Sequence, residues 1–206
     1  MIKAIIFDYF GVIGSVKNHG AKKRIAEAFG VTEETVGPVL GKLIPDFRTG
    51  RLTEIQFFRE IAAVLGKPLP ENTHDIWRAG FQENLITDKK IMDFIKQLKA
   101  RDLKMGILSN TLPPWAEIVR NNGGFTDFDS VVLSCEVGLQ KPDPKVYELA
   151  LDRLGVRGEE SLFVDDKEEN LEVARSLGMR TVLAESPDQI IQDINTAIAT
   201  SHSRAE

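Results

Sequence analysis

The sequence has 206 residues, 42% of them hydrophobic, and a formal net charge of −5. This length and hydrophobic content are enough for one packed α/β domain with a small insert. It has no block of basic residues and no apolar stretch near the ~20 residues of a membrane helix, so neither nucleic acid nor a membrane is expected as a partner. The one cysteine, Cys135, excludes an internal disulfide, and no signal peptide is recognisable, so we expect a cytoplasmic protein, either a monomer or a homodimer.

The chain opens with an apolar run that ends abruptly in a carboxylate. Residues 3–7 leave no polar face, which predicts a strand buried on both sides, and Asp8 follows immediately. Asp8 therefore lies at the carboxyl end of a strand, where open α/β sheets bind ligands. A carboxylate there is costly to desolvate and needs a cation partner or a chemical task, unless it only caps the next turn.

The next part of the sequence has helical patterns only. We predict a helical stretch from Gly14, a helix capped by Thr53 with Gln56 three residues on, and a break at residues 67–70, which contain two prolines. Residues 15–85 show no strand signal. They are therefore predicted to form a helical cap inserted after the first strand.

From residue 88 onward, helical and strand patterns alternate. Parallel βαβ units are the expected result, and the predicted fold is a three-layer, Rossmann-like α/β core formed by residues 1–14 and 86–206. The predicted helices are 88–101, 113–122, 143–154 and 168–177, and the predicted strands are 104–108, 130–134, 161–165 and 180–184.

Polar residues follow three of these later strands. Ser109 and Asn110 follow one, Lys141 comes shortly after the next, and Asp165 and Asp166 end a third, with Asn170 four residues beyond. One such ending would be weak support for a site. Together with Asp8, four in this order are strong support.

These motifs resemble the haloacid dehalogenase (HAD) superfamily of aspartate-nucleophile hydrolases, in the branch with a helical cap inserted early (C1, subfamily IA-like phosphatases). The matching residues are Phe7-Asp8-x-x-Gly11-Val12, Leu108-Ser109-Asn110, Lys141-Pro142-Asp143-Pro144 and Phe163-Val164-Asp165-Asp166-x-x-x-Asn170, and the likeness covers residues 1–185. The resemblance implies phosphoryl transfer, as in most members, or carbon–halogen hydrolysis, as in a few.

The acids are expected to hold a metal. Asp8, Asp165 and Asp166 would converge at neighbouring strand ends, where they repel one another unless a cation joins them, and oxygen ligands suit Mg²⁺. The resemblance implies that Asp8, the backbone carbonyl of Phe10 and Asp166 bind the metal, with Asp165 binding directly or through water. Asn170 is expected to orient the acids. The alternative is an acidic pair that only caps the following helix.

The phosphate of a substrate would lie beside these acids. We expect the Ser109 hydroxyl, the Asn110 backbone N–H and Gly11 to contact it, and Lys141 to supply positive charge to the nucleophile and the transferring group. Lys141 could instead be a solvated loop lysine. In the implied mechanism Asp8 attacks phosphorus, and water then hydrolyses the aspartyl-phosphate.

One position departs from the pattern of the resemblance. Phosphatases of this family usually carry a second Asp two residues after the nucleophile as general acid and base, and here that residue is Phe10. General acid–base catalysis is worth ~10²–10⁴ in rate, or about 3–5 kcal/mol of barrier. The loss is large for alkyl phosphates and matters less for acyl, enol or anomeric phosphates, or if a water or a cap residue substitutes.

Three functions stay open. The favoured one is a Mg²⁺-dependent phosphatase acting on a small phosphorylated metabolite. The second is a 2-haloacid dehalogenase-like hydrolase, which resembles this chain in having an aromatic residue at the position of Phe10 but works without metal and lacks the adjacent acidic pair. The third is a catalytically weak relative that binds a phosphorylated ligand or a protein.

Roles outside the motifs are also open. Arg48 and Arg51 could grip a second anionic group of the substrate, or could be surface arginines. His19 could reach the site as a substitute acid, or could lie on the surface of the cap. Trp115 could line the entrance, or could only pack.

Overall fold

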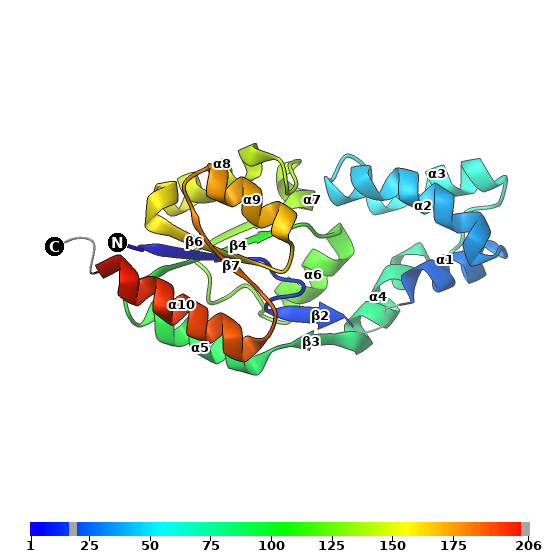
Figure 1. Ribbon diagram of the computed structural model, residues 1–206. Helices are drawn as coiled ribbons and strands as arrows, with labels where there is room; N and C mark the ends of the chain where they lie inside the picture. The colour runs from blue at the N-terminus through cyan, green and yellow to red at the C-terminus, as the bar shows by residue number, and fades with distance from the viewer. Residues whose placement is uncertain (17–19, 203–206) are drawn as a thin grey trace.

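The computed structural model describes residues 1–16 and 20–202. Its centre is a five-stranded parallel sheet in the order β5-β4-β1-β6-β7 (Figure 1). The strands are β1 (Ala4–Phe7), β4 (Lys104–Ser109), β5 (Ser130–Leu133), β6 (Ser161–Asp165) and β7 (Arg180–Leu183). The first strand lies in the middle, with Phe7 paired to Ile107 of β4 on one side and Val164 of β6 on the other.

Helices cover both faces of the sheet, which confirms the predicted three-layer α/β core. One face packs against α5 (Lys89–Lys99), α6 (Pro113–Asn121) and α10 (Pro187–His202), and the other against α8 (Pro144–Leu154) and α9 (Glu168–Ser176). Successive residues of a strand point to opposite faces, so Ile5 belongs to one apolar cluster and Ile6 to the other. Burial on both faces explains why β1 has no polar residue. Two short helical turns, α7 (Ser134–Val137) and a 3₁₀ turn at Gly158–Glu160, complete this sheet unit.

Four helices inserted between β1 and β4 form a second cluster, which we call the helical insert. They are α1 (Ala21–Phe29), α2 (Glu33–Arg48), α3 (Glu54–Leu65) and α4 (Thr73–Asn84). The predicted capping box is present, since Thr53 accepts from the Gln56 backbone and the Gln56 side chain accepts from Thr53. The predicted break at residues 67–70 lies between α3 and α4. Within the described part of the chain, no helix has the length and apolarity needed to cross a membrane.

Two short strands correct the prediction for residues 15–85. The chain does not enter a helix at Gly14: β2 (Gly14–Val16) pairs antiparallel with β3 (Leu85–Thr87), and α1 starts only at Ala21. Each strand has three residues and its partner lies far away in the sequence, so no local alternation reveals the pair. Both predicted domain boundaries fall inside this two-stranded ribbon, through which the chain enters and leaves the helical insert.

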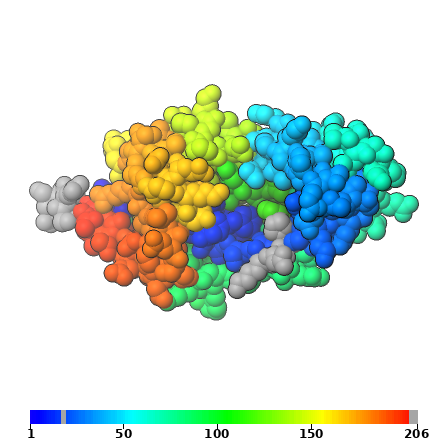
Figure 2. Space-filling view, turned by 45° about the vertical axis from the view of Figure 1, so that its right-hand side comes forward, coloured from blue at the N-terminus to red at the C-terminus, as the bar shows by residue number. Residues whose placement is uncertain are grey.

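The helical insert also contacts the sheet unit at two other places. On one side, Phe81 of α4 stacks on Trp115 of α6, with ring centroids 4.9 Å apart. On the other side, the Ser134 hydroxyl donates to the Arg48 carbonyl over 2.8 Å. A space-filling view shows a hollow between the two units, with the blue N-terminal segment exposed in it (Figure 2). The carboxyl ends of the strands face this side of the sheet unit.

Candidate active site

The parallel sheet brings the predicted residues to one edge. Asp8 directly follows β1, and its backbone N–H still donates to the Val164 carbonyl of β6. Ser109 and Asp165 are the last residues of β4 and β6, the two neighbours of β1. Because these strands are parallel and in register, their terminal side chains meet beside Asp8.

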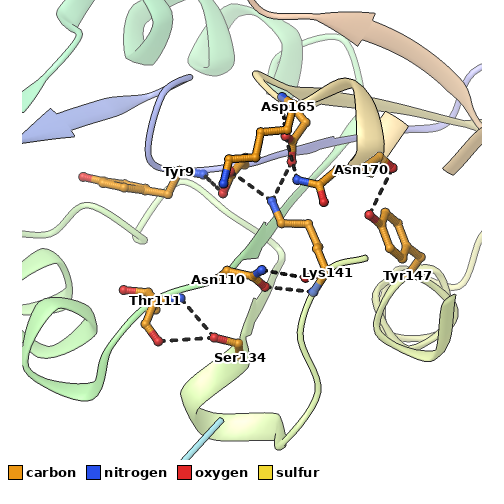
Figure 3. A network of polar contacts seen from close by, with 10 residues as sticks. Tyr9, Asn110, Thr111, Ser134, Lys141, Tyr147, Asp165 and Asn170 are labelled. Atoms are coloured by element: carbon orange, nitrogen blue, oxygen red, sulfur yellow. Dashed lines mark hydrogen bonds and ion pairs between the residues drawn. The ribbon is translucent and has the colours of Figure 1, made fainter. Parts of the chain in front are cut away.

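Lys141 joins this group from the loop before α8 (Figure 3). Its Nζ lies 3.0 Å from Oδ2 of Asp8 and 2.6 Å from Oδ2 of Asp165, and its side chain is only 1% exposed. The alternative of a solvated loop lysine is therefore wrong. A lysine this deeply buried is stable as a cation only because two carboxylates surround it.

A second set of hydrogen bonds orients Asp165. Its other oxygen, Oδ1, accepts from the Lys167 backbone N–H and from Nδ2 of Asn170, each over 2.9 Å. The Tyr147 hydroxyl in turn donates to the Asn170 carbonyl over 3.0 Å (Figure 3). Asn170 thus lies where the sequence predicted an orienting group, whereas Tyr147 was not predicted at all.

Asp166 completes a cluster of three acids. Asp8, Asp165 and Asp166 each offer a carboxylate oxygen, and these oxygens lie within 4.8 Å of one another. Burial raises the pKa of Asp8 although Lys141 favours its ionised form. Burial and the charge of Asp165 also raise the pKa of Asp166. The cluster thus carries more negative charge than Lys141 balances.

Gly11 lets the turn after the nucleophile pass close to this cluster. Its φ is +92°, a conformation that glycine adopts freely, and a Cβ atom there would lie 2.5 Å from Oδ2 of Asp166. Any side chain at position 11 would therefore displace the Asp166 carboxylate. The structure places Gly11 against Asp166, and the phosphate contact expected of Gly11 stays a prediction.

An all-oxygen donor set with excess negative charge fits a hard divalent cation. Mg²⁺ binds carboxylates, backbone carbonyls and water in this way. Burial raises the pKa of Asp8 and of Asp166, and the charge of Asp165 adds to both shifts, so a cation bound beside them would favour their ionised forms. These residues therefore suit Mg²⁺.

The loop after β4 supplies the neutral groups of the site. The Asn110 side chain exchanges two 2.8 Å hydrogen bonds with the backbone of Lys141, so it fixes the loop that carries the lysine. The Ser109 hydroxyl is buried near Asp8 and favours the ionised form of that carboxyl, which lowers its pKa. In the described part of the chain, however, no group lies in good hydrogen-bonding geometry to this hydroxyl. A buried hydroxyl beside the nucleophile can donate to a ligand that binds there.

Comparison with known proteins decides the family. The family model of the haloacid dehalogenase-like hydrolases matches residues 2–178. The chain belongs to this family. The predicted resemblance is thereby confirmed, together with the α/β fold class.

Individual relatives differ in length and in activity. The chain is 26% identical over 212 residues to mouse Acyl-CoA dehydrogenase family member 10, covering 95% of this chain but only 19% of that protein. It is 27% identical over 196 residues to the D-ribitol-5-phosphate phosphatase of Bacteroides thetaiotaomicron, covering 90% of this chain and 93% of the relative. A crystal structure of a HAD family enzyme from B. thetaiotaomicron in complex with magnesium and inorganic phosphate superposes with a TM-score of 0.74 and 23% identity, covering 90% of this chain and 96% of that one.

The Phe10 side chain packs against other aromatic rings. Its ring is partly buried among Tyr9, Phe81 and Trp115, with centroid distances of 5.0, 5.8 and 6.0 Å. Trp115 therefore packs, and in doing so it touches both Phe10 and the helical insert. The sequence did not predict this aromatic cluster, because its members come from three separate segments.

The two arginines named in the sequence analysis differ in exposure. Arg51 pairs with Asp46 and its side chain is 70% exposed, so it is a surface arginine. Arg48 is half-buried in the last turn of α2; burial lowers its pKa, and among the described residues no carboxylate forms an ion pair with it. His19 lies outside the described residues.

Proposed function

We propose that this chain is a Mg²⁺-dependent phosphohydrolase that acts on a small phosphorylated metabolite through an aspartyl-phosphate intermediate. The observation that carries the proposal is the buried Lys141, held between Asp8 and Asp165 beside a third acid. A nucleophilic carboxylate, a fixed cation and a metal-binding set of acids are together what phosphoryl transfer requires. The D-ribitol-5-phosphate phosphatase and the magnesium- and phosphate-bound structural neighbour support this assignment.

The metal would be held by Asp8, the backbone carbonyl of Phe10 and Asp166, with Asp165 binding directly or through water. Replacing the family's usual Asp by Phe10 leaves a backbone carbonyl unchanged, so the side chain at this position does not affect that ligand. When bound, Mg²⁺ would neutralise charge on the phosphoryl oxygens and on the acids around them.

The protein's own residues would act in two steps. First, an Asp8 carboxylate oxygen attacks phosphorus in line, the bond to the leaving oxygen breaks, and an aspartyl-phosphate forms. Lys141 and the Ser109 hydroxyl stabilise the charge on the equatorial oxygens. Water then attacks the phosphorus of the aspartyl-phosphate, releasing inorganic phosphate and restoring Asp8.

The dehalogenase alternative has one feature in its favour, the aromatic residue at position 10. Halide leaves without a proton, so it needs no acid there. Against it, Asp165 and Asp166 add negative charge beside the nucleophile, which a metal-free reaction would have to overcome. We therefore favour the phosphatase.

A substrate screen tests the proposal. Release of inorganic phosphate is measured from a panel of phosphorylated metabolites and from 4-nitrophenyl phosphate, with Mg²⁺ and with a chelator, for the wild-type chain and for Asp8→Asn. We expect metal-dependent phosphate release that Asp8→Asn abolishes. Halide release from 2-chloropropionate in the presence of chelator, with no phosphate release from any compound, would instead establish the dehalogenase.

A further inference from the structure

A hollow of about 550 Å³ lies at the end of the sheet opposite the acids. Its lining includes Lys3, directly before β1, and Lys104, the first residue of β4, whereas Asp8 and Ser109 lie at the other ends of these two strands. The length of β4 separates the two ends by roughly 17 Å. In Figure 1 the N-terminus marks this end of the sheet, and the helical insert lies on the opposite side. The hollow is therefore separate from the candidate active site, and it has the size of a small-molecule pocket.

A second hollow, of about 320 Å³, adjoins the first. Lys104 and its two preceding residues line both, so the two hollows lie next to each other, and we call them together the basic hollow. Among the described residues that line it, five are basic and two are acidic: Lys3, Lys99, Arg101, Lys104 and Arg153, with Asp102 and Asp129. This is a local excess of positive charge in a chain whose formal net charge is −5. Such an excess attracts anions to the hollow.

Ion pairs neutralise two of the five cations. Lys3 lies 2.6 Å from a carboxylate oxygen of Glu160, and Lys99 lies 3.1 Å from one of Asp129. These two lysines therefore contribute little to the excess.

The other three cations keep their full charge. Nζ of Lys104 donates to the Leu154 carbonyl over 2.6 Å, and the Arg153 guanidinium donates to a backbone carbonyl of β5 over 3.0 Å. Arg101 is exposed, and in the part of the chain that the structure describes no carboxylate forms an ion pair with any of these three side chains. A carbonyl oxygen carries no net charge, so it positions a cation without neutralising it. Of the acids in the lining, only Asp102 then remains to offset three cations.

We propose that the basic hollow binds a chain of linked phosphates, either a free polyphosphate or the triphosphate of a nucleotide. Arg101 and Lys104 line the larger part, and Lys104 and Arg153 line the smaller part. A single phosphate reaches only one of these parts, whereas linked phosphates place negative charge in both. Guanidinium and ammonium groups bind phosphate oxygens through charge-assisted hydrogen bonds. The ligand occupies this site without touching the nucleophile.

A calorimetric titration with tripolyphosphate tests the site. The full chain is titrated in the presence of a chelator, because polyphosphates bind Mg²⁺ themselves. We expect inorganic phosphate to bind at least about tenfold more weakly, since it cannot contact both parts of the lining at once. ATP titrated in the same way separates the two sources: equal affinity assigns recognition to the phosphates alone, and tighter binding of ATP shows that the nucleoside is also held. No binding of either compound at millimolar concentration would overturn the proposal.

Substitutions in the lining locate the bound anion. Arg101→Ala and Lys104→Met should each weaken tripolyphosphate binding about two- to fivefold, and the double variant about tenfold, as expected for exposed charge pairs that act independently. Arg59→Ala is the matched control, because Arg59 is an exposed arginine on α3 of the helical insert, and it should bind like the wild type. Equal weakening in the control would reveal general attraction to a cationic surface and overturn the proposal.

Ser109→Ala separates this site from the candidate active site. Ser109 lies at the other end of β4, so the variant should bind tripolyphosphate like the wild type. Loss of binding in Ser109→Ala, with full binding in the double variant of Arg101 and Lys104, would place the anion beside Asp8 and overturn the proposal. Both substituted cations are exposed, so the double variant should keep the wild-type melting temperature, which shows that weaker binding does not come from unfolding.

Discussion

Nζ of Lys141 lies 3.0 Å from Oδ2 of Asp8, although the two residues come from distant parts of the chain and both are buried. The contact depends on two supports: the Asn110 side chain fixes the backbone of Lys141, and Asp165 holds the other side of the ammonium group. Lys141 therefore has a structural role as well as a chemical one. It keeps two carboxylates together in the interior of the protein.

Removing this cation should be costly. Lys141→Met keeps the length of the side chain but leaves Asp8 and Asp165 facing each other without a partner, and breaking a buried ion pair in this way costs about 3–5 kcal/mol. We expect that loss in the free energy of unfolding measured with urea, together with loss of phosphate release. Lys145→Met is the matched control, since Lys145 is exposed and lies on the same loop-to-helix segment. Equal stability of the two variants would contradict the role assigned to Lys141.

The acid cluster should destabilise the metal-free protein. Because the pKa of Asp166 is raised in the folded state, the folded chain binds more protons than the unfolded chain at pH values between 3.8 and the raised pKa. The free energy of unfolding therefore falls as the pH rises through this interval. Asp166→Asn removes the titrating group and should raise the melting temperature of the metal-free protein at pH 7.

The same substitution should abolish the response to Mg²⁺. A ligand that binds only the folded state stabilises it, so millimolar Mg²⁺ should raise the melting temperature of the wild-type chain. Asp166→Asn should show little or no rise, whereas Asp152→Asn, an exposed position on α8, should respond like the wild type. A full Mg²⁺ response in Asp166→Asn would remove Asp166 from the metal site.

Substitution of Gly50 tests the contact between the helical insert and the sheet unit. Its φ is +69°, and a Cβ atom there would overlap the carbonyl oxygen of Cys135, so Gly50→Ala must push the end of α2 away from α7. Gly66 has a similar φ of +63°, with no atom near the position of a Cβ. Gly66→Ala should therefore lower the free energy of unfolding only by the backbone strain of an alanine in this conformation, about 1–2 kcal/mol. We expect Gly50→Ala to lose more stability than Gly66→Ala and, unlike it, to lower kcat/KM. Indistinguishable variants would mean that this contact does not hold the insert in place.

An ion pair on the surface, far from the site, should contribute to the acid sensitivity of the folded protein. Lys3 and Glu160 lie 2.6 Å apart, and the hydrogen bond from Lys3 is the main reason that the pKa of Glu160 falls from 4.5 to about 2. A lowered carboxyl pKa stabilises the folded state above pH 4.5, and this contribution is lost as the pH falls from 4.5 toward 2. Glu160→Gln should therefore flatten the decline of stability over that interval. Glu148→Gln, at an exposed position, should follow the wild-type curve.

The parts of the site that follow from strand order could be predicted from the sequence. An apolar run such as β1 identifies a strand buried on both faces, and parallel pairing then forces Asp8, Ser109 and Asp165 to one edge. Contacts between distant segments could not be predicted in this way. The ribbon of β2 and β3 has too few residues to show a period, and nothing around Tyr147 in the sequence reveals that its hydroxyl reaches the Asn170 carbonyl.

Phe10 shows the same limit at a functional position. The sequence identifies the missing acid by comparison with the family pattern, but it cannot say what surrounds the ring. Phe81 and Trp115 reach it only through the docking of the helical insert on the sheet unit. This aromatic cluster is thus a property of the tertiary structure.

The most direct test of the proposed mechanism is to trap the covalent intermediate. The wild-type chain is mixed with acetyl phosphate and Mg²⁺, quenched in acid within the first turnover, and digested for mass spectrometry that locates the phosphoryl group. We predict a phosphorylated peptide modified at Asp8, absent without Mg²⁺ and absent in Asp8→Asn. Phosphate release by the wild-type chain with no modification at Asp8, or with equal release by Asp8→Asn, would contradict nucleophilic attack by this carboxylate.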